Sequence, residues 1–359
     1  MHITNYLAKA AFFSLNKLDR LVEAHPTDHT KIVVKGSNVL PLKVGSQYFV
    51  LDSDVELGTA TDLDTGAVAA GTNYYVYALD NAGVLAFVLS ANSTYPDGYT
   101  AANSRKIGGF HTLSASVGTI AGHTLSGYLA NDILPASIWD LKHRPVSNPE
   151  GMVYVDVINK WVDIYLASGT GVNTASVNGG TISDNRTWLD FVDDFAAVKK
   201  SLLDDSEFQA AAAGSNEETN ITGSADPVTT GPHTDTAGRR MISNYGIEDA
   251  CGVMWQWLDE QGYRFDGAAN HTHAVTVSGD PETVNTGNPS GDVAPAFGYY
   301  DLPGAKGSLY RQGTYGDVKV HAGGSWDIAA IAGSRARRAH TWRWPAGTYL
   351  GGRGRAEPI

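Results

Sequence analysis

The sequence NYYVYALDNAGVLAFVL, residues 73–89, decides the architecture of the first part of the chain. Two runs of aromatic and aliphatic residues flank the short segment 80–83, which ends in glycine. Such runs favour β-strands, and a short loop containing glycine favours an antiparallel hairpin. Shorter runs of the same kind at 32–34, 47–51 and 106–110 extend the pattern on both sides. The sequence therefore predicts a small all-β unit.

The next part of the chain combines a second hairpin with two helices. Two apolar runs around a polar turn predict a hairpin over residues 152–166. Apolar residues at helical spacing predict an amphipathic helix over 188–198. A shorter helix is predicted over 204–213, because Asp204 and Glu207 have the spacing of a capping pair and a glycine follows. This unit is therefore expected to be α+β.

Long segments rich in Gly, Ser, Thr, Asn and Pro at 214–240 and 264–306 predict large loops. Loops of this length in a compact domain are usually surface excursions or binding elements. The expected fold class is thus β-rich and α+β. The predicted organisation is an N-terminal arm at 1–40 that contacts other subunits, a β-sandwich-like domain at 41–112, a linker at 113–137 and a loop-rich α+β domain at 138–359.

The composition excludes several classes of function. A formal net charge of −12 argues against a partner nucleic acid or a membrane surface. No apolar run approaches the ~18 residues of a membrane span, and the N-terminus lacks the basic-then-apolar pattern of a signal peptide. The single cysteine, Cys251, excludes an intrachain disulfide and a multi-cysteine zinc site. We expect neither nucleic-acid binding nor membrane insertion.

No catalytic or metal-binding motif stands out. His271 and His273 could share one face of a strand and bind a metal, but a polar loop with two solvated histidines is the simpler interpretation. His25 and His29 have i,i+4 spacing, yet Pro26 interrupts any helix there. A phosphate-binding glycine loop, a nucleophile elbow and a His-Glu-x-x-His motif are absent from the sequence. We expect no catalytic residue, metal or cofactor, with a structural calcium or magnesium ion as an open alternative.

The C-terminal segment 321–359 differs from the rest of the acidic chain. It contains six arginines against two carboxylates, and three of the eight tryptophans. Arg, Trp and Tyr are enriched at the energetic centres of interfaces, so this composition favours a recognition surface. The alternative is a solvated or intersubunit arginine face over tryptophans that fill the core.

Short glycine-containing blocks in this segment carry a resemblance to a known family. The chain resembles the variable proteins of diversity-generating retroelements, and among them the major tropism determinants, receptor-binding proteins at the tip of phage tail fibres. The blocks are Gly323-Gly324-Ser325-Trp326, Gly333-Ser334-Arg335-Ala336 and Gly351-Gly352-Arg353-Gly354, preceded in the same order by residues 70–74, 106–111, 138–145, 206–210 and 250–257.

The resemblance implies a C-type lectin fold of the formylglycine-generating-enzyme-like subtype for residues 138–359, with a variable region at about 321–355. It implies a homotrimer on the virion surface, in a tail fibre, that binds a cell-surface receptor, either protein or glycan. Two alternatives remain. A formylglycine-generating-type enzyme would need a pair of cysteines for copper, whereas this chain has only Cys251. A structural fibre segment would show no clustered variability.

In this family, reverse transcription mutates adenines, so an asparagine codon can become any codon that ends in a pyrimidine. The resemblance therefore implies exposed, clustered, ligand-binding variable positions at Asp327, Ile328, Ala329, Ile331, Arg338, Ala339, His340, Thr341, Thr348, Tyr349 and Leu350. Tryptophan cannot arise from such a codon, so Trp326, Trp342 and Trp344 are expected to be framework residues or descendants of arginine codons. The expected framework is Gly323, Gly324, Trp326, Gly333, Arg335, Trp255 and Trp257.

Overall fold

The computed structural model describes residues 20–36, 41–264, 298–301, 308–311, 316–341 and 343–359. The chain forms two compact units. The first extends to residue 116 and includes residues 128–144, and the second comprises residues 117–127 and 145–358.

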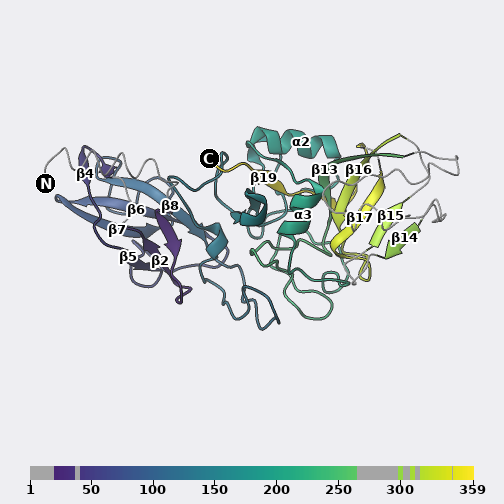
Figure 1. The fold of residues 1–359 in the computed structure, drawn as a ribbon, viewed down its shortest axis with the longest axis horizontal. Helices are drawn as coiled ribbons and strands as arrows, with labels where there is room; N and C mark the ends of the chain where they lie inside the picture. Colours follow the sequence, from purple (N-terminus) through teal and green to yellow (C-terminus); the bar gives the residue numbers. More distant parts are fainter. Residues whose placement is uncertain (1–19, 37–40, 265–297, 302–307, 312–315, 342) are drawn as a thin grey trace. The chain divides into compact units, whose positions relative to one another are not determined.

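The first unit contains three antiparallel sheets (Figure 1). The sheet β1-β2-β5 and the hairpin β3-β4 accompany a sheet of order β7-β6-β8-β9. Their apolar faces enclose one core, to which Val34, Val76 and Ile107 each contribute a fully buried side chain. The strands are β1 (Val22–Ala24), β2 (Lys31–Val34), β3 (Leu42–Val44), β4 (Gln47–Phe49), β5 (Val55–Gly58), β6 (Asn73–Asn81), β7 (Val84–Ser90), β8 (Ser104–His111) and β9 (Trp139–Asp140), with a 3₁₀ turn at Pro135–Ser137.

The central hairpin of this unit confirms the strand prediction. Strands β6 and β7 pair antiparallel from Tyr75 opposite Ser90 to Asn81 opposite Val84. A loop of only two residues, Ala82 and Gly83, joins them, and both have positive φ. A glycine suits this position because it adopts left-handed backbone angles without steric cost.

The domain boundaries differ from the predicted ones at three places. Residues 20–36 are not an arm, because β1 and β2 pair with each other and Val22 and Ile32 are fully buried in the core. Residues 117–127 belong to the second unit, where the His123 ring contacts the carbonyl of Ile242 at 3.1 Å. Residues 138–144 belong to the first unit, because β9 pairs with β8.

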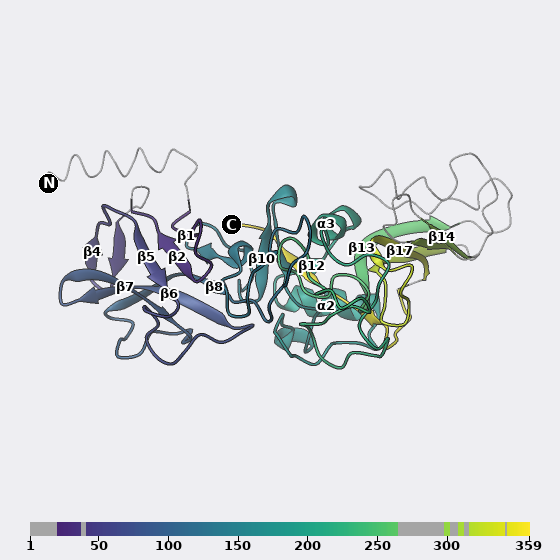
Figure 2. The same ribbon diagram turned by 90° about the horizontal axis from the view of Figure 1, so that it is seen from below.

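In the part of the second unit that the structure describes there are two sheets and two helices (Figures 1 and 2). One sheet has the order β10-β11-β19-β12, and the larger one has the order β14-β15-β17-β16-β13-β18. The elements are β10 (Met152–Val155), β11 (Lys160–Asp163), α2 (Trp188–Ala197), β12 (Ser201–Leu202), α3 (Asp205–Ala211), β13 (Trp255–Arg264), β14 (Gly298–Asp301), β15 (Ser308–Arg311), β16 (Gly316–Gly323), β17 (Gly333–Thr341), β18 (Leu350–Gly351) and β19 (Gly354–Ala356), with 3₁₀ turns at Asp156–Ile158 and Gly171–Asn173.

Both helices begin with a capping box. At α3, the side chain of Asp204 accepts the N–H of Glu207 at 2.7 Å, and the Glu207 carboxylate accepts the N–H of Asp204 at 2.9 Å. This confirms the predicted capping pair. Thr187 and Asp190 form the same reciprocal arrangement at the start of α2. The helix and hairpin predictions were correct here because a capping box and a short turn depend only on neighbouring residues.

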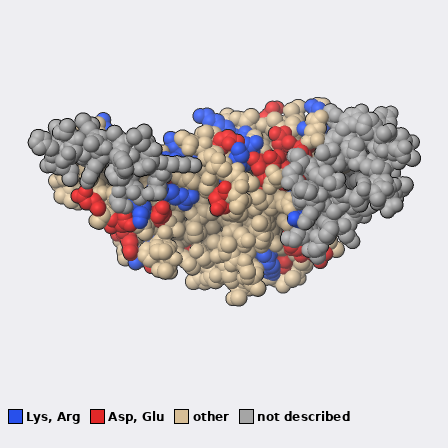
Figure 3. Space-filling view, viewed as in Figure 1, with Lys and Arg blue, Asp and Glu red and all other residues tan. Residues whose placement is uncertain are grey.

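The core of the second unit lies between α2 and the larger sheet. Phe191 and Phe195 from α2 pack with Trp255 and Trp257 from β13, and all four side chains are fully buried. Trp255 and Trp257 thus occupy the interior positions expected of a framework. Figure 3 shows that acidic and basic side chains are interspersed on the face it displays. No helix of the described residues is long and apolar enough to cross a membrane.

Candidate functional site

The predicted variable positions fall on two loops and on two strands, β17 and β18, of the larger sheet. Strands β16 and β17 pair antiparallel, and the loop 324–332 connects them. A second loop, 343–349, leads into β18. Gly324 at the start of the first loop has φ +87°, and a Cβ there would lie 2.8 Å from the Cα of Ala332. Only glycine fits this turn, which agrees with a framework position.

Trp326 connects the two loops. Its indole N–H donates to the carbonyl of Thr348 at 3.4 Å, and its backbone N–H donates to Val253 at 2.9 Å. The side chain of Asn220 donates to the Trp326 carbonyl. The indole itself is half-buried and packs against the cluster that contains Met254. Trp326 therefore fixes the first loop to the second loop and to the core.

Several predicted residues lie together on this framework. Ile328, Ile331 and Tyr349 are half-buried and pack on the outside of the tryptophan-rich cluster. The guanidinium of Arg338 lies 5.3 Å from the centre of the Tyr349 ring, a cation–π contact. We call the set that these contacts join the C-terminal surface; its residues are Trp326, Asp327, Ile328, Ile331, Arg338, Thr348 and Tyr349.

The exposure of the predicted positions varies. Asp327 is exposed, and the hydroxyl of Ser325 donates to its carboxylate at 2.5 Å. Ala329 and Thr341 are half-buried, and the hydroxyl of Thr341 lies 3.4 Å from the His321 ring. The side chain of His340 lies outside the described residues.

Two predicted positions are buried, so the prediction of exposure is wrong for them. Ala339 is 0 % exposed and Leu350 is 1 % exposed. Ala339 follows Arg338 on β17, and successive side chains of a strand point to opposite faces. Leu350 opens β18, the edge strand that pairs with β13, and its side chain packs in the cluster that contains Trp255 and Trp257. Neither side chain is available to a ligand in this chain.

A buried arginine that no sequence pattern distinguishes joins β17, next to the first loop, to helix α3. Arg337 is fully buried, and its Nε donates to the carboxylate of Asp205 at the start of α3. Its Nη1 donates to the carbonyls of Ser334 and Ala336 at 3.0 and 2.9 Å. The ion pair joins β17 to α3. Arg335, the expected framework arginine, is only half-buried.

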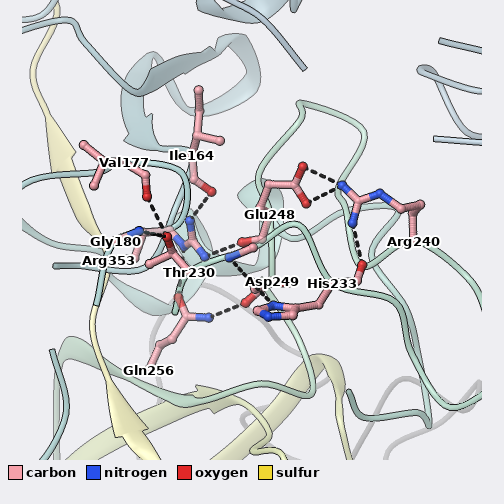
Figure 4. Close-up of polar contacts among 11 residues, drawn as sticks. Ile164, Val177, Gly180, Thr230, His233, Arg240, Glu248, Asp249, Gln256 and Arg353 are labelled. Atoms are coloured by element: carbon pink, nitrogen blue, oxygen red, sulfur yellow. Dashed lines mark hydrogen bonds and ion pairs between the residues drawn. The ribbon is translucent and has the colours of Figure 1, made fainter. Parts of the chain in front are cut away.

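A second buried arginine, Arg353, organises the interior of the unit (Figure 4). Its guanidinium donates to the carbonyls of Asp163, Ile164 and Glu248 at 2.6–2.8 Å and to the side chain of Gln256 at 3.1 Å. Burial lowers the pKa of Arg353 to about 10, so the group stays charged at neutral pH. These acceptors belong to two parts of the chain, residues 163–164 and residues 248–256, and the Arg353 side chain holds the two parts together.

The same network continues toward the large loop 214–240. Glu248 accepts two hydrogen bonds from Arg240, at 2.7 and 2.8 Å. Asp249 lies 2.8 Å from the ring nitrogen Nδ1 of His233. Burial alone lowers the pKa of His233, but the hydrogen bond and charge of Asp249 outweigh it, so the pKa is raised. Because these charged groups form hydrogen bonds with one another, we interpret the network as one that stabilises the fold and does not bind a ligand.

The His233–Asp249 pair predicts a pH dependence of stability. Because the folded-state pKa of His233 lies above its usual 6.5, its stabilising contribution is complete below pH 6.5 and is lost as pH rises through the folded-state pKa. We expect the free-energy difference between the wild type and His233→Gln, from urea unfolding, to shrink as pH rises above 6.5. A difference that grows over this range would contradict the assignment.

Among the described residues, no group of three or more His, Cys, Asp or Glu side chains is placed to hold a metal ion. Burial raises the pKa of the Cys251 thiol well above its usual value, which disfavours the nucleophilic thiolate. His25 lies 3.4 Å from Glu56, and His29 stacks on Tyr128. His271 and His273 lie outside the described residues.

Comparisons with known proteins bear on both units. Residues 23–140 match the family model described as Mtd second domain. The chain is 27 % identical over 343 residues to the tail fiber receptor-binding protein of Bordetella phage BPP-1, covering 89 % of this chain and 80 % of that protein. The predicted resemblance is therefore confirmed.

Solved structures agree at the level of the fold. The Major Tropism Determinant M1 variant superposes with a TM-score of 0.69 at 23 % identity, covering 97 % of this chain and 87 % of that chain. The I1 variant gives 0.69 at 24 %, covering 97 % and 88 %. The chain thus has the β-rich fold, with few helices, of these C-type lectin-like proteins.

Proposed function

We propose that this chain is the receptor-binding protein of a phage tail fibre, located on the virion surface, and that its C-terminal surface contacts the host receptor. The observation that carries the proposal is the similarity to the Bordetella phage receptor-binding protein over 89 % of the chain. The relatives named are receptor-binding proteins, and we propose neither catalysis nor a resident cofactor or metal for this chain. The receptor is a protein or a glycan of the host cell.

The geometry suits this function because the C-terminal surface rests on a rigid framework. Trp326 fastens one loop to the other, and Arg337 fastens β17 to α3. A surface that is already ordered loses less conformational entropy on binding than a mobile loop does. We propose that the second unit is a C-type lectin domain of the formylglycine-generating-enzyme-like subtype that serves as this framework.

We further propose that a diversity-generating retroelement varies the surface. Sequencing of the neighbouring DNA tests this: we expect a near-copy of the codons for about residues 320–355, differing at adenines, beside a reverse transcriptase gene. Because the side chains of Ala339 and Leu350 are buried, we exclude both residues from the proposed ligand contacts. The proposed ligand contacts are Asp327, Ile328, Ala329, Ile331, Arg338, Thr341, Thr348 and Tyr349.

The function itself is tested by cell binding. Fluorescently labelled protein is expected to bind to host cells in a saturable manner and to reduce adsorption of the parent phage when added in excess. Adsorption that is unaffected by saturating protein would contradict the proposal.

We propose that the protein assembles as a homotrimer, because a trimer presents three surfaces at once and gains avidity. Light scattering of the purified protein is expected to give a mass near three times 38.1 kDa. A monomer that persists at micromolar concentration would count against trimeric assembly.

A further inference from the structure

The loop 343–349 carries an exposed tryptophan at its centre. Trp344 is 62 % exposed, whereas the other tryptophans with described side chains are buried or half-buried. Tryptophan is on average one of the more buried residues, so such exposure needs a reason. Of the two expectations for Trp344, a framework residue or a descendant of an arginine codon, this exposure contradicts a buried framework role.

The loop that carries this tryptophan is fixed at both ends. At its start, the N–H of Trp188 in α2 donates to the carbonyl of Arg343 at 3.1 Å. Near its end, the carbonyl of Gly347 accepts the N–H of Asn185 at 3.2 Å and that of Leu350 at 3.1 Å. These bonds join the loop to the helix, to the segment before it and to β18.

The residues that follow the tryptophan restrict the loop further. Pro345 disfavours helical backbone angles at the preceding residue and holds it in an extended conformation. Beyond it, the Thr348 carbonyl accepts the indole N–H of Trp326. The carbonyl of Tyr349 accepts the N–H of Trp255 at 2.9 Å. The exposed indole therefore projects from a fixed platform.

We propose that Trp344 is a constant anchor of the receptor contact, which inserts into an apolar pocket on a protein receptor whatever side chains occupy the variable positions. This inference rests on the proposed function. Mutation of asparagine codons at adenines cannot produce tryptophan, and the proposal takes Trp344 as constant, not as the descendant of an arginine codon. It supplies affinity that does not depend on the particular target, while the variable residues select among targets.

The surroundings of Trp344 favour a protein over a glycan. The same loop ends in Tyr349, over which Arg338 stacks. Trp, Tyr and Arg together are the residues enriched at the energetic centres of protein interfaces.

The test compares Trp344→Ala with Tyr48→Ala in the full-length protein. Tyr48 is 68 % exposed in the first unit and is a matched control for loss of an exposed aromatic ring. We expect W344A to weaken binding to host cells at least tenfold, with the melting temperature and the light-scattering mass unchanged. Y48A is expected to bind like the wild type. W344F is expected to recover part of the affinity.

The outcomes separate this inference from the proposed function. If the wild type binds cells and W344A binds equally well, the anchor is refuted and receptor binding stands. If W344A lowers the mass that light scattering gives for the assembly, Trp344 is a subunit contact and the inference fails. Protease treatment of the cells is expected to abolish binding, whereas loss of binding only after periodate oxidation of their glycans would overturn the protein receptor. Absence of wild-type binding would refute both proposals.

Discussion

Replacement of Arg353 by methionine is expected to lower the free energy of unfolding by about 4 kcal/mol, because four buried acceptors lose the hydrogen bonds from Arg353 and each acceptor left unsatisfied costs about 1–3 kcal/mol. These acceptors are the side chain of Gln256 and the carbonyls of Asp163, Ile164 and Glu248. Methionine fills part of the space but donates no hydrogen bond. Urea unfolding monitored by tryptophan fluorescence measures the loss.

The control for this prediction is Arg144→Met. The side chain of Arg144 is exposed, so its replacement is expected to change the free energy of unfolding by no more than about 0.5 kcal/mol. Equal effects of the two substitutions would show that Arg353 does not hold the interior of the second unit together.

Joint replacement of Asp327 by Lys, Ile328 by Gln and Thr341 by Glu is expected to weaken adhesion to host cells at least 100-fold. The changes place new charge and polarity on the C-terminal surface at Asp327 and Ile328 and at Thr341, a further proposed ligand contact on β17, where hot-spot losses combine to several kcal/mol. Ile328 is half-buried, so the free energy of unfolding should fall by about 1 kcal/mol. Cell binding and urea unfolding of the same preparation measure the two effects.

A matched control carries Tyr48→Lys and Val84→Gln. Both side chains are more than 60 % exposed in the first unit. This variant is expected to adhere like the wild type, because it leaves the C-terminal surface intact. Loss of adhesion in the control with retention in the triple variant would place the receptor contact on the first unit instead.

The sequence predicts those features that depend on neighbouring residues. The hairpin of β6 and β7 follows from two apolar runs around a short loop, and the start of α3 follows from Asp204 and Glu207. Strand β1 escapes such reasoning because it has only three residues, and although the run 32–34 predicts β2, the pairing of β2 with β1 and β5 depends on segments distant in the chain. Only the core they share shows that they belong to the first unit.

The sequence predicts where the candidate site lies in the chain, but it does not predict which side chains of the site are exposed. The family pattern places Trp326, Arg338 and Tyr349 in one segment, and the structure brings them together through hydrogen bonds and a cation–π contact. The codon argument takes no account of which face of a strand a residue occupies. The variable set therefore includes the buried Ala339, and the exposed Trp344 is expected to be either a framework residue or a descendant of an arginine codon.

The buried arginines could not be identified from the sequence because arginine is mostly exposed in proteins. The carboxylate that pairs with Arg337 belongs to Asp205, which is 132 residues earlier in the chain. The acceptors of Arg353 are mainly backbone carbonyls, which leave no trace in residue types. Long-range contacts of this kind become visible only in the folded chain.

If the C-terminal surface determines which cell is bound, selection for altered tropism changes the residues of that surface. Phage carrying this protein are selected for adsorption to cells that the parent does not bind, and the gene is sequenced from independent isolates. We expect substitutions concentrated at Asp327, Ile328, Ile331, Arg338, Thr348 and Tyr349, with Trp326, Trp344, Arg337 and Arg353 unchanged. Substitutions that fall mainly in the first unit, or that replace the framework residues, would contradict this expectation.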